Sequence, residues 1–454
     1  MEATPSYSEE LNKEGRATAT LPQKRTKRDT FAACVGTFTE YYDIGIYALV
    51  APTIATHFFP PGDQAAAVLS TFAIFALGFV VRPFGSILFG AIGDRLGRTR
   101  ALTTALLLMA ASTFAVGILP TWSSIGVVAP LLLLLCRVVQ SISVGGEFAG
   151  ASSYLLETSE PAKRGRTIGI LNFAVAIPPL VVAALLYLIS SVLDNAAYEA
   201  WGWRIPFLLA APLGLIGLYL RLRLKESDEF IAMKEEGEQV KNPVATALKT
   251  QWRRMLQLAA ATAVTATASF ILNSYMVTYL TGTLGYSRDD ALLMSCAASL
   301  CFGIFILVGG SLADRYGRRP VLLIGNGVLI VALIPCFLLV TAGHVALAML
   351  GMILFAACLG PVSTAAFIIA GELFPTSVRY TCNAVSYNFS YAAFGGTAPF
   401  IAAWMVSATG VTIAPAIYAT AITLIATVAL FFTLKETRGN ALRDGAEAAS
   451  PQPN

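Results

Sequence analysis

The chain has 454 residues, of which 56% are hydrophobic and only 13% are charged, about half the charged fraction of an average soluble domain. Charge-free stretches of 52 and 55 residues separate Arg319 from Glu372 and Arg379 from Lys435. Each stretch has room for two membrane-spanning helices and a turn, because one span needs about 20 apolar residues. The composition therefore excludes a soluble enzyme, a nucleic-acid-binding protein and a disulfide-linked secreted domain.

Twelve hydrophobic helices follow one another along the chain, separated by turn residues such as Pro60, Pro61 and Gly62 after the first helix. We expect an all-α membrane protein with twelve transmembrane helices. Their ranges are 31–56, 66–92, 101–120, 125–150, 166–190, 204–222, 255–280, 290–312, 320–341, 345–370, 380–405 and 412–433.

A long polar stretch after the sixth helix divides the twelve helices into two sets of six. The predicted units are a cytoplasmic N-terminal segment (1–30), a first six-helix bundle (31–222), a cytoplasmic central loop (223–254), a second six-helix bundle (255–434) and a cytoplasmic tail (435–454).

The distribution of basic residues predicts the orientation. With the N-terminus inside, the cytoplasmic segments hold 27 of the 31 Lys and Arg residues. An excess of Lys and Arg in cytoplasmic loops is the usual signal of orientation. We expect a multi-pass protein of the inner cell membrane with both termini in the cytoplasm.

Two motifs occur twice, about 220 residues apart. The pattern Gly-x-x-x-Asp-Arg-x-Gly-Arg follows the second and the eighth predicted helices, and a Glu seven residues before an Arg follows the fourth and the tenth. Repetition at nearly one offset indicates duplicated halves in parallel orientation. The residues of the two motifs are Gly90, Asp94, Arg95, Gly97, Arg98, Glu157 and Arg164 in the first half, and Gly310, Asp314, Arg315, Gly317, Arg318, Glu372 and Arg379 in the second.

Asp94 and Asp314 lie at cytoplasmic helix ends, where each is expected to meet the positive N-terminus of a helix from the other half. These loops resemble the typical motif of the major facilitator superfamily. The resemblance implies the major facilitator fold, with two pseudo-symmetric six-helix bundles, and a transporter rather than an enzyme. It also implies that the repeated residues close a cytoplasmic gate, with arginines bridging to acids such as Glu157 and Glu372. Simple anchoring of basic loops explains the arginines but not the repeated Asp and Gly.

Further segments of the first half resemble the metabolite:proton symporter family within that superfamily. This family includes carriers of citrate, 2-oxoglutarate and shikimate and of the zwitterions proline and betaine. The matching segments are residues 36–47, Arg82-Pro83-Phe84-Gly85, residues 137–147 and residues 202–207.

Ionisable residues inside spans are costly and mark functional sites by default. Glu40, Asp43 and Tyr47 are spaced to share one face of the first helix, and the two acids are expected to face Arg82 and Arg137. The predicted substrate and proton translocation residues are Glu40, Asp43, Tyr47, Arg82, Arg137 and Glu147. A permanent salt-bridge lattice between helices is the alternative interpretation.

Six uncharged polar residues in other spans are possible ligand contacts, although such residues often only link helices. They are Asn172, Asn273, Tyr275, Asn383, Tyr387 and Asn388. Two histidines and seven dispersed cysteines offer no metal-binding spacing. We therefore expect no metal, no cofactor and no catalytic residue, with a proton gradient as the energy source.

The leading functional hypothesis is proton-coupled import of a small carboxylate metabolite by alternating access. Proton symport of a zwitterionic osmolyte such as proline or betaine is the alternative, and a non-transporting sensor with a transporter fold is a remote one. The expected partners are a small-molecule substrate, protons and the lipid bilayer, with no nucleic acid and a monomeric functional unit.

Overall fold

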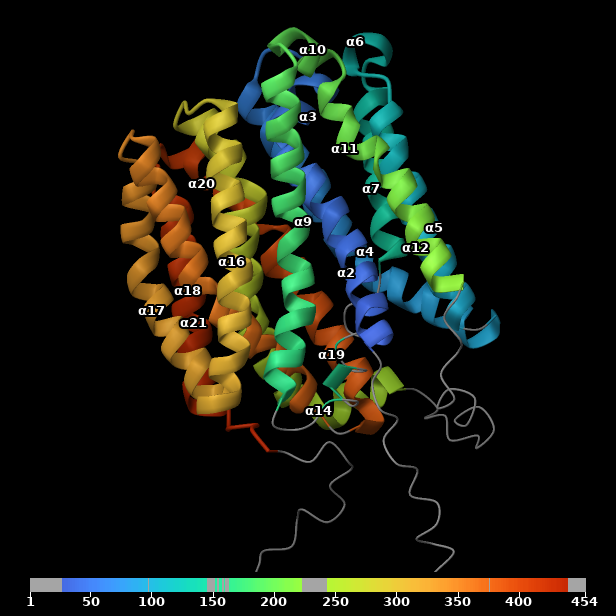
Figure 1. The fold of residues 1–454 in the computed structure, drawn as a ribbon, viewed down its shortest axis with the longest axis vertical. Coiled ribbons are helices and arrows are strands. Elements are labelled where there is room, and N and C mark those ends of the chain that lie inside the picture. The colour runs from blue at the N-terminus through green and yellow to red at the C-terminus, as the bar shows by residue number, and fades with distance from the viewer. Residues whose placement is uncertain are drawn as a thin grey trace, which may run out of the picture.

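The computed structural model describes residues 27–96, 98–144, 163–222, 243–374 and 376–439, together with residues 152, 155, 156 and 159. The regular elements of these residues are helices, and most of them run nearly parallel along the long axis of the molecule (Figure 1). The all-α fold predicted from the composition is confirmed.

The helices of the first half match the first six predicted spans. The first span consists of two helices because the backbone departs from helical geometry at Val50, immediately before a helix with Pro52 in its first turn. The helices are α2 (Lys27–Leu49), α3 (Ala51–Phe58), α4 (Gln64–Leu96), α5 (Arg98–Ile118), α7 (Val128–Ser143), α9 (Arg164–Val192), α11 (Ile205–Leu208) and α12 (Ala210–Leu222), with short α6 (Trp122–Ile125), α10 (Asn195–Ala200) and η2 (Gly202–Arg204) in connections.

The second half contains the remaining six spans. Two of them include π-helical turns, in which the backbone hydrogen bonds widen by one residue and which frequently lie at functional sites. The elements are α14 (Pro243–Phe270), η3 (Ile271–Tyr275), α15 (Met276–Thr278), η4 (Tyr279–Thr283), α16 (Arg288–Tyr316), α17 (Arg318–Val340), α18 (Val345–Glu372), α19 (Thr376–Ser390), η5 (Tyr391–Gly396), α20 (Ala398–Thr409) and α21 (Ala414–Thr433).

Within the described residues, nine helical stretches are long and apolar enough to cross a membrane, and Thr103–Ile118 and Val128–Ser143 are shorter apolar helices. The one remaining predicted span is the first, which the pair α2 and α3 forms and in which Glu40 and Asp43 lower the mean hydropathy. The twelve-helix fold is therefore the one expected from the sequence.

One boundary differs clearly from the prediction. Helix α14 begins at Pro243, twelve residues before the predicted start of the seventh span, so the last part of the predicted central loop is helical. Proline is favoured in a first helical turn, and the following Ala, Leu, Lys, Gln and Arg residues are strong helix formers. The prediction followed hydropathy, which these charged residues lower.

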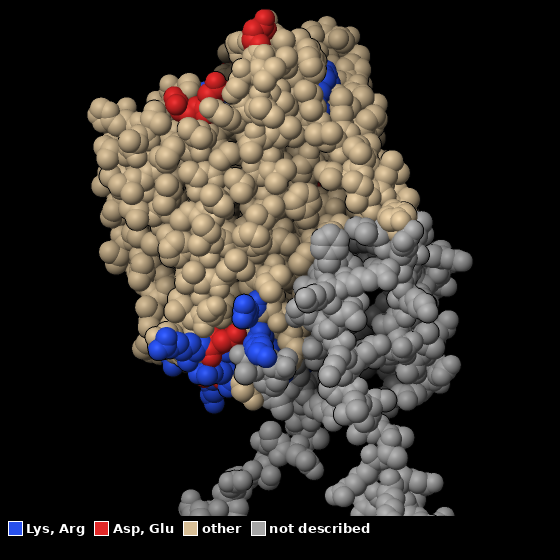
Figure 2. Space-filling view, in the orientation of Figure 1, with Lys and Arg blue, Asp and Glu red and all other residues tan. Residues whose placement is uncertain are grey.

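The two halves meet along a seam where α9 lies beside α16 (Figure 1). A single buried hydrophobic cluster extends across this seam and includes side chains from both halves. On the face in Figure 2, Lys and Arg gather at one end of the molecule. We call this the basic end and define it by Arg164, Arg315, Arg318 and Arg319.

Candidate functional site

Two buried ion pairs lie inside the first half. Arg82 Nη1 on α4 is 3.0 Å from Glu40 Oε1 on α2, and Arg137 Nη1 on α7 is 3.0 Å from Asp43 Oδ2 on α2. None of the four residues is more than 5% exposed. The sequence predicted that the acids of the first helix face these arginines, and the two pairs have that arrangement.

The Asp43 pair is part of a closed ring of hydrogen bonds. Thr113 on α5 donates to Asp43 Oδ1 (2.7 Å), and Gln140 on α7 donates to Thr113 Oγ1 (3.1 Å). Arg137 Nη1 donates to both Asp43 and Gln140, the latter at 2.8 Å. All four residues belong to the first half, so this network moves as part of one bundle.

Aromatic faces cover both guanidinium groups. Arg137 Cζ lies 4.4 Å from the ring centre of Tyr47, and Arg82 Cζ lies 4.1 Å from that of Phe79. These distances are typical of cation–π contacts, which strengthen when water is excluded. The Tyr47 hydroxyl donates to the Thr71 carbonyl oxygen (3.0 Å). Tyr47 therefore supports Arg137 with its ring, a role that its helical spacing alone did not indicate.

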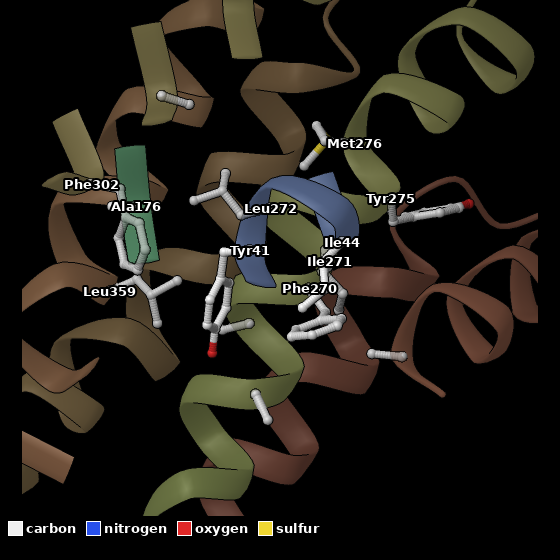
Figure 3. Close-up of a cluster of buried hydrophobic side chains, with 14 of the residues drawn as sticks. Tyr41, Ile44, Ala176, Phe270, Ile271, Leu272, Tyr275, Met276, Phe302 and Leu359 are labelled. Atoms are coloured by element: carbon white, nitrogen blue, oxygen red, sulfur yellow. The ribbon is translucent and has the colours of Figure 1, made fainter. Parts of the chain in front are cut away.

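Five aromatic rings meet at the seam beside the Glu40–Arg82 pair. The hydroxyls of Tyr41 and Tyr387 are 2.7 Å apart and join α2 to α19 across the two halves. Figure 3 shows two of them, Tyr41 on α2 and Phe270 on α14, among other buried hydrophobic side chains. We call the five the seam rings: Tyr41 and Phe79 from the first half, and Phe270, Tyr387 and Tyr391 from the second.

The other predicted ligand contacts divide between the seam and the second half. Asn172 on α9 donates to Ser363 on α18 (3.2 Å), a contact between the halves. Asn273 donates to the Ser269 carbonyl oxygen and accepts from Ser299 (3.2 Å), both within the second half.

The last three predicted ligand contacts are Asn383, Tyr275 and Asn388. Asn383 donates to Ser152 (3.4 Å) and the Tyr275 ring packs edge-on against Phe72, so both contacts join the two halves. Asn388 is buried.

At the basic end, an acid from one half meets a helix N-terminus of the other. Asp314, near the end of α16, accepts hydrogen bonds from the backbone amides of Gly165 (2.8 Å) and Arg166 (2.9 Å) at the start of α9. Negative charge is favourable at this position because the helix dipole places partial positive charge there. This is the contact that the sequence predicted for the second copy of the motif.

Arginines of both halves converge on Glu372, at the end of α18. Arg318 forms a two-pronged ion pair with it (2.9 and 3.0 Å), and Arg164 of the first half lies 3.8 Å away. Arg318 also lies 3.5 Å from Asp314. Arg379 is buried and donates to the Phe374 carbonyl oxygen (3.2 Å). Arg315 stacks near Tyr316, so it is not part of this cluster.

The backbone geometry explains why two positions of the motif, 310 and 317, are glycine. A Cβ on Gly310 would lie 2.6 Å from the Gly165 carbonyl oxygen, and a Cβ on Gly165 would lie 2.5 Å from that of Gly310. Gly317, with φ of 99°, occupies the left-handed turn between α16 and α17. The repeated glycines therefore permit the close approach and the turn that form the basic end.

Several predicted residues of the first half are not part of the description. The motif residues Gly97 and Glu157 lie outside the described residues, as does Glu147, which was predicted to take part in translocation. Only the backbone is described for Gly90, Asp94, Arg95 and Arg98. Helix α4 nevertheless extends to Leu96, so the backbone of Asp94 is helical.

Two residues after the last span were missed by the sequence analysis. Glu436 accepts hydrogen bonds from the backbone amides of Arg318 (2.9 Å) and Arg319 (3.1 Å), at the start of α17. Thr437 donates to Glu372 Oε2 (2.8 Å). A lone acid directly after a span was the only available signal, because the partner of such a residue is distant in sequence.

The opposite end of the molecule also has contacts between the halves. Arg288, at the start of α16, pairs with Glu199 on α10 and donates to Asn195 (3.1 Å). His57 Nε2 lies 3.2 Å from Glu199 Oε2. The hydrogen bond with His57 and the charge of Arg288 lower the pKa of Glu199, against an opposing effect of burial. We call Glu199, His57 and Arg288 the outer cluster.

The Tyr198 ring packs against this cluster, with Arg288 Cζ 3.9 Å from the ring centre. Burial raises the pKa of Tyr198 to about 12, so its hydroxyl stays neutral at physiological pH. Among the described residues, no group of three or more His, Cys, Asp or Glu side chains is arranged to hold a metal ion.

Comparison with known proteins places these features in context. Residues 30–259 match the family model of sugar (and other) transporters, and residues 258–453 match that of the Major Facilitator Superfamily. A proline/betaine transporter of Escherichia coli K12 is 35% identical over 430 residues, covering 92% of this chain and 85% of its own.

Other relatives have similar sequence identity and coverage. The glycine betaine/proline/ectoine/pipecolic acid transporter OusA of Dickeya dadantii is 34% identical over 435 residues (94% of this chain, 86% of its own). The inner membrane metabolite transport protein YhjE of E. coli K12 is 36% identical over 421 residues (90% and 94%). A crystal structure of a D-xylose-proton symporter superposes with a TM-score of 0.74 at 18% identity, covering 91% of this chain and 99% of that one. At that identity the likeness concerns the fold.

Proposed function

The chain belongs to the major facilitator superfamily of membrane transporters, and from this premise we propose that it is a proton symporter of a small zwitterionic carboxylate such as proline or betaine. The relatives named for proline and betaine support the zwitterion alternative of our sequence hypotheses better than the organic-acid one. We further propose that it lies in the inner membrane with the basic end in the cytoplasm, as the excess of basic residues there favours.

The observation that carries the proposal is the charge balance of the buried site. Both arginines of this site have a carboxylate partner, Glu40 for Arg82 and Asp43 for Arg137. While both acids are charged, before the proton binds, a zwitterion adds no net charge to this balanced group, whereas a dicarboxylate adds two negative charges to a site that excludes water. Uncompensated buried charge is strongly unfavourable. The pairing therefore favours a zwitterion over a di- or tricarboxylate.

In the proposed mechanism the zwitterion inserts between Arg82 and Glu40. Its carboxylate replaces Glu40 as the partner of Arg82, whose planar guanidinium suits bidentate carboxylate binding. Its cationic group then becomes the partner of Glu40. Both members of the pair exchange one partner for another of the same charge, so the substrate does not leave either of them uncompensated.

We assign the proton to Asp43. Its two oxygens are held by Thr113 and Arg137, which both belong to the first bundle. Protonation weakens the pair with Arg137 and frees the guanidinium to hold Gln140 more tightly, which loosens the side-chain link between α2 and α7. Substrate and proton thus act on neighbouring residues of the same helix, as coupling requires.

Alternating access then requires the contacts at the two ends to break in turn. At the basic end these are the Asp314 contact with the start of α9 and the Arg164–Glu372 pair. At the opposite end they are the Arg288 contacts with Glu199 and Asn195. Substrate bound at the seam can bias this exchange because it contacts both halves.

Uptake into proteoliposomes tests the proposal. With an inward proton gradient, we expect accumulation of labelled glycine betaine or proline and none of citrate or 2-oxoglutarate, because only the zwitterions preserve the charge balance. A protonophore is expected to abolish accumulation but not exchange of internal for external substrate. Liposomes without protein and a sodium gradient without a proton gradient are the controls. Accumulation of citrate alone, or sodium-dependent uptake that survives the protonophore, contradicts the proposal.

A further inference from the structure

We propose that the seam rings form a binding site for a fully N-methylated ammonium group, so that the carrier prefers betaines to amino acids with N–H groups. This inference rests on the proposed function and extends it from zwitterions in general to quaternary ammonium zwitterions. The observations that carry it are the position, the packing and the charge environment of the five rings.

The rings contact one another closely and come from both halves. The ring centres of Tyr387 and Tyr391 are 4.1 Å apart, and those of Phe79 and Phe270 are 5.1 Å apart and nearly perpendicular. Phe270 also packs edge-on against Tyr391 at 5.8 Å. The rings therefore pack on one another within one small region at the seam.

The charges beside the rings match the two ends of a betaine. Arg82 lies over Phe79, and its partner Glu40 is adjacent in sequence to Tyr41 and close enough to Tyr387 and Tyr391 to interact electrostatically. A betaine carboxylate on Arg82 places the ammonium group one carbon atom away, toward Glu40 and the rings. The negative ring faces and the carboxylate attract the same cationic group.

The chemistry of the rings distinguishes a quaternary ammonium from one with N–H bonds. An ammonium with hydrogens requires hydrogen-bond acceptors once water is excluded. Glu40 can accept from such a group, but the five rings themselves offer only tyrosine hydroxyls, and those of Tyr41 and Tyr387 already contact each other. A trimethylammonium group has no donor to satisfy, is weakly hydrated and offers methyl groups to the ring faces. The site therefore favours full methylation.

The same contact links binding to the two halves. The methyl groups must enter where the rings now pack on one another, which separates Tyr41 on α2 from Tyr387 on α19. In the bound state the cation replaces this direct hydroxyl contact as the link between the halves. A ligand without a cationic group cannot make that replacement.

Equilibrium binding to the purified protein in lipid nanodiscs tests the inference. The ligands are glycine betaine, its carbon isostere 3,3-dimethylbutanoate, in which a neutral tert-butyl group replaces the trimethylammonium beside the same carboxylate, and proline. We expect betaine to bind at least about tenfold more tightly than either of the others, because the isostere keeps the shape and the carboxylate but lacks the cation. This comparison needs no variant. Equal affinity for betaine and the isostere overturns the inference.

Variants then locate the site. We expect Phe270→Leu to weaken betaine binding about tenfold or more and proline binding less than threefold, and Phe270→Tyr, which keeps a ring, to preserve the preference. Phe355→Leu is the matched control, because Phe355 is equally buried but lies on α18 against Phe337. Parallel losses for betaine and proline in Phe270→Leu overturn the inference.

The wild-type protein distinguishes a failure of the proposed function from a failure of the ring site. If it binds carboxylates but neither zwitterion, the proposed function itself fails. Zwitterion binding without a preference for betaine overturns only the ring site.

Discussion

Two acids three residues apart on one helix have different surroundings. Glu40 lies beside the seam rings and pairs with Arg82, whereas Asp43 lies in a hydrogen-bonded ring within the first half. The difference follows from helix geometry, because three residues advance about 4.5 Å along the axis and so place the two carboxylates at different depths. One acid is therefore suited to the substrate and the other to the proton.

Asp43→Asn is expected to separate exchange from accumulation. The amide oxygen still accepts from Thr113 or Arg137, but the side chain can no longer carry a proton. We expect exchange of labelled for unlabelled betaine to continue while accumulation driven by a proton gradient is lost.

The variant also leaves Arg137 without its charge partner, which is costly in a buried site by about 3–5 kcal/mol. The double variant Asp43→Asn with Arg137→Gln restores the charge balance and serves as the control for folding. Normal proton-driven accumulation in Asp43→Asn contradicts the assignment of the proton to this residue.

Both ion pairs could be predicted from the sequence, because charged residues inside a span are rare and are stable there only when they are paired. It did not identify Tyr41, which lies directly between the recognised residues Glu40 and Asp43 in the same helix. Tyrosine is common in spans, and its partner Tyr387 is 346 positions away. The contact between them depends on how the two bundles dock, and no local pattern encodes that docking.

At the scale of the elements, α9 and α16 approach so closely at the basic end that neither Gly165 nor Gly310 has space for a methyl group. The amides of α9 can reach Asp314 only because of this approach. A wider separation lengthens those hydrogen bonds and weakens the contact of the acid with the helix N-terminus. The glycines and the aspartate of the motif thus act together.

Gly310→Ala is expected to open the basic end. The added methyl group meets the Gly165 carbonyl oxygen, so we expect faster labelling of a cysteine placed at Gly169 on α9, in a background without the seven native cysteines. Transport is expected to fall severalfold without loss of folded protein.

Gly327→Ala is the matched control, because a Cβ there has no other atom within 4 Å. Unchanged labelling and transport in Gly310→Ala would show that the helices adjust without separating.

The twelve spans were predictable from hydropathy, but their irregularities were not. The π-helical turns at Ile271–Tyr275 and Tyr391–Gly396 change the hydrogen-bond pattern without changing the composition. Only Gly395 and Gly396 indicated a weak point in the helix. The contacts of Glu436 with α17 were equally unpredictable, because an acid that caps a helix distant in sequence has no recognisable local pattern.

Across the whole molecule, the two halves touch at both ends and in the middle. Asp314 joins them at the basic end, Tyr41 and Tyr387 at the centre, and Arg288 and Glu199 at the opposite end. The outer cluster is the part of this seam whose charge changes most directly with external pH in the proposed orientation.

The pH dependence of the outer cluster follows from the lowered pKa of Glu199. A carboxylate with a lowered pKa stabilises its contacts above the ordinary glutamate pKa of about 4.3, and this contribution disappears as the pH falls through the lowered value. We expect spin labels on Ala196→Cys and Gly282→Cys, one in each half, to show a longer distance in acid than at pH near 7.

Glu199→Gln removes the charge at every pH. It is expected to give the longer distance near pH 7 already and to abolish the acid-dependent change. The groups facing Glu199 are His57 and Arg288, with Tyr198 and Asp289 nearby, so His57→Gln serves to separate the contribution of the imidazole. A distance that is independent of both pH and Glu199→Gln shows that other contacts hold this end closed.

The balance of the two buried ion pairs also has an electrical consequence. In the proposed cycle the empty carrier returns with Glu40–Arg82 and Asp43–Arg137 both neutral as pairs, so this step performs no work against the membrane potential. The loaded carrier holds a neutral zwitterion and one extra proton, and a single charge crossing the membrane gains about 2.3 kcal/mol per 100 mV. Voltage therefore drives the inward step alone, and each substrate molecule imported is recorded as one unit of inward current.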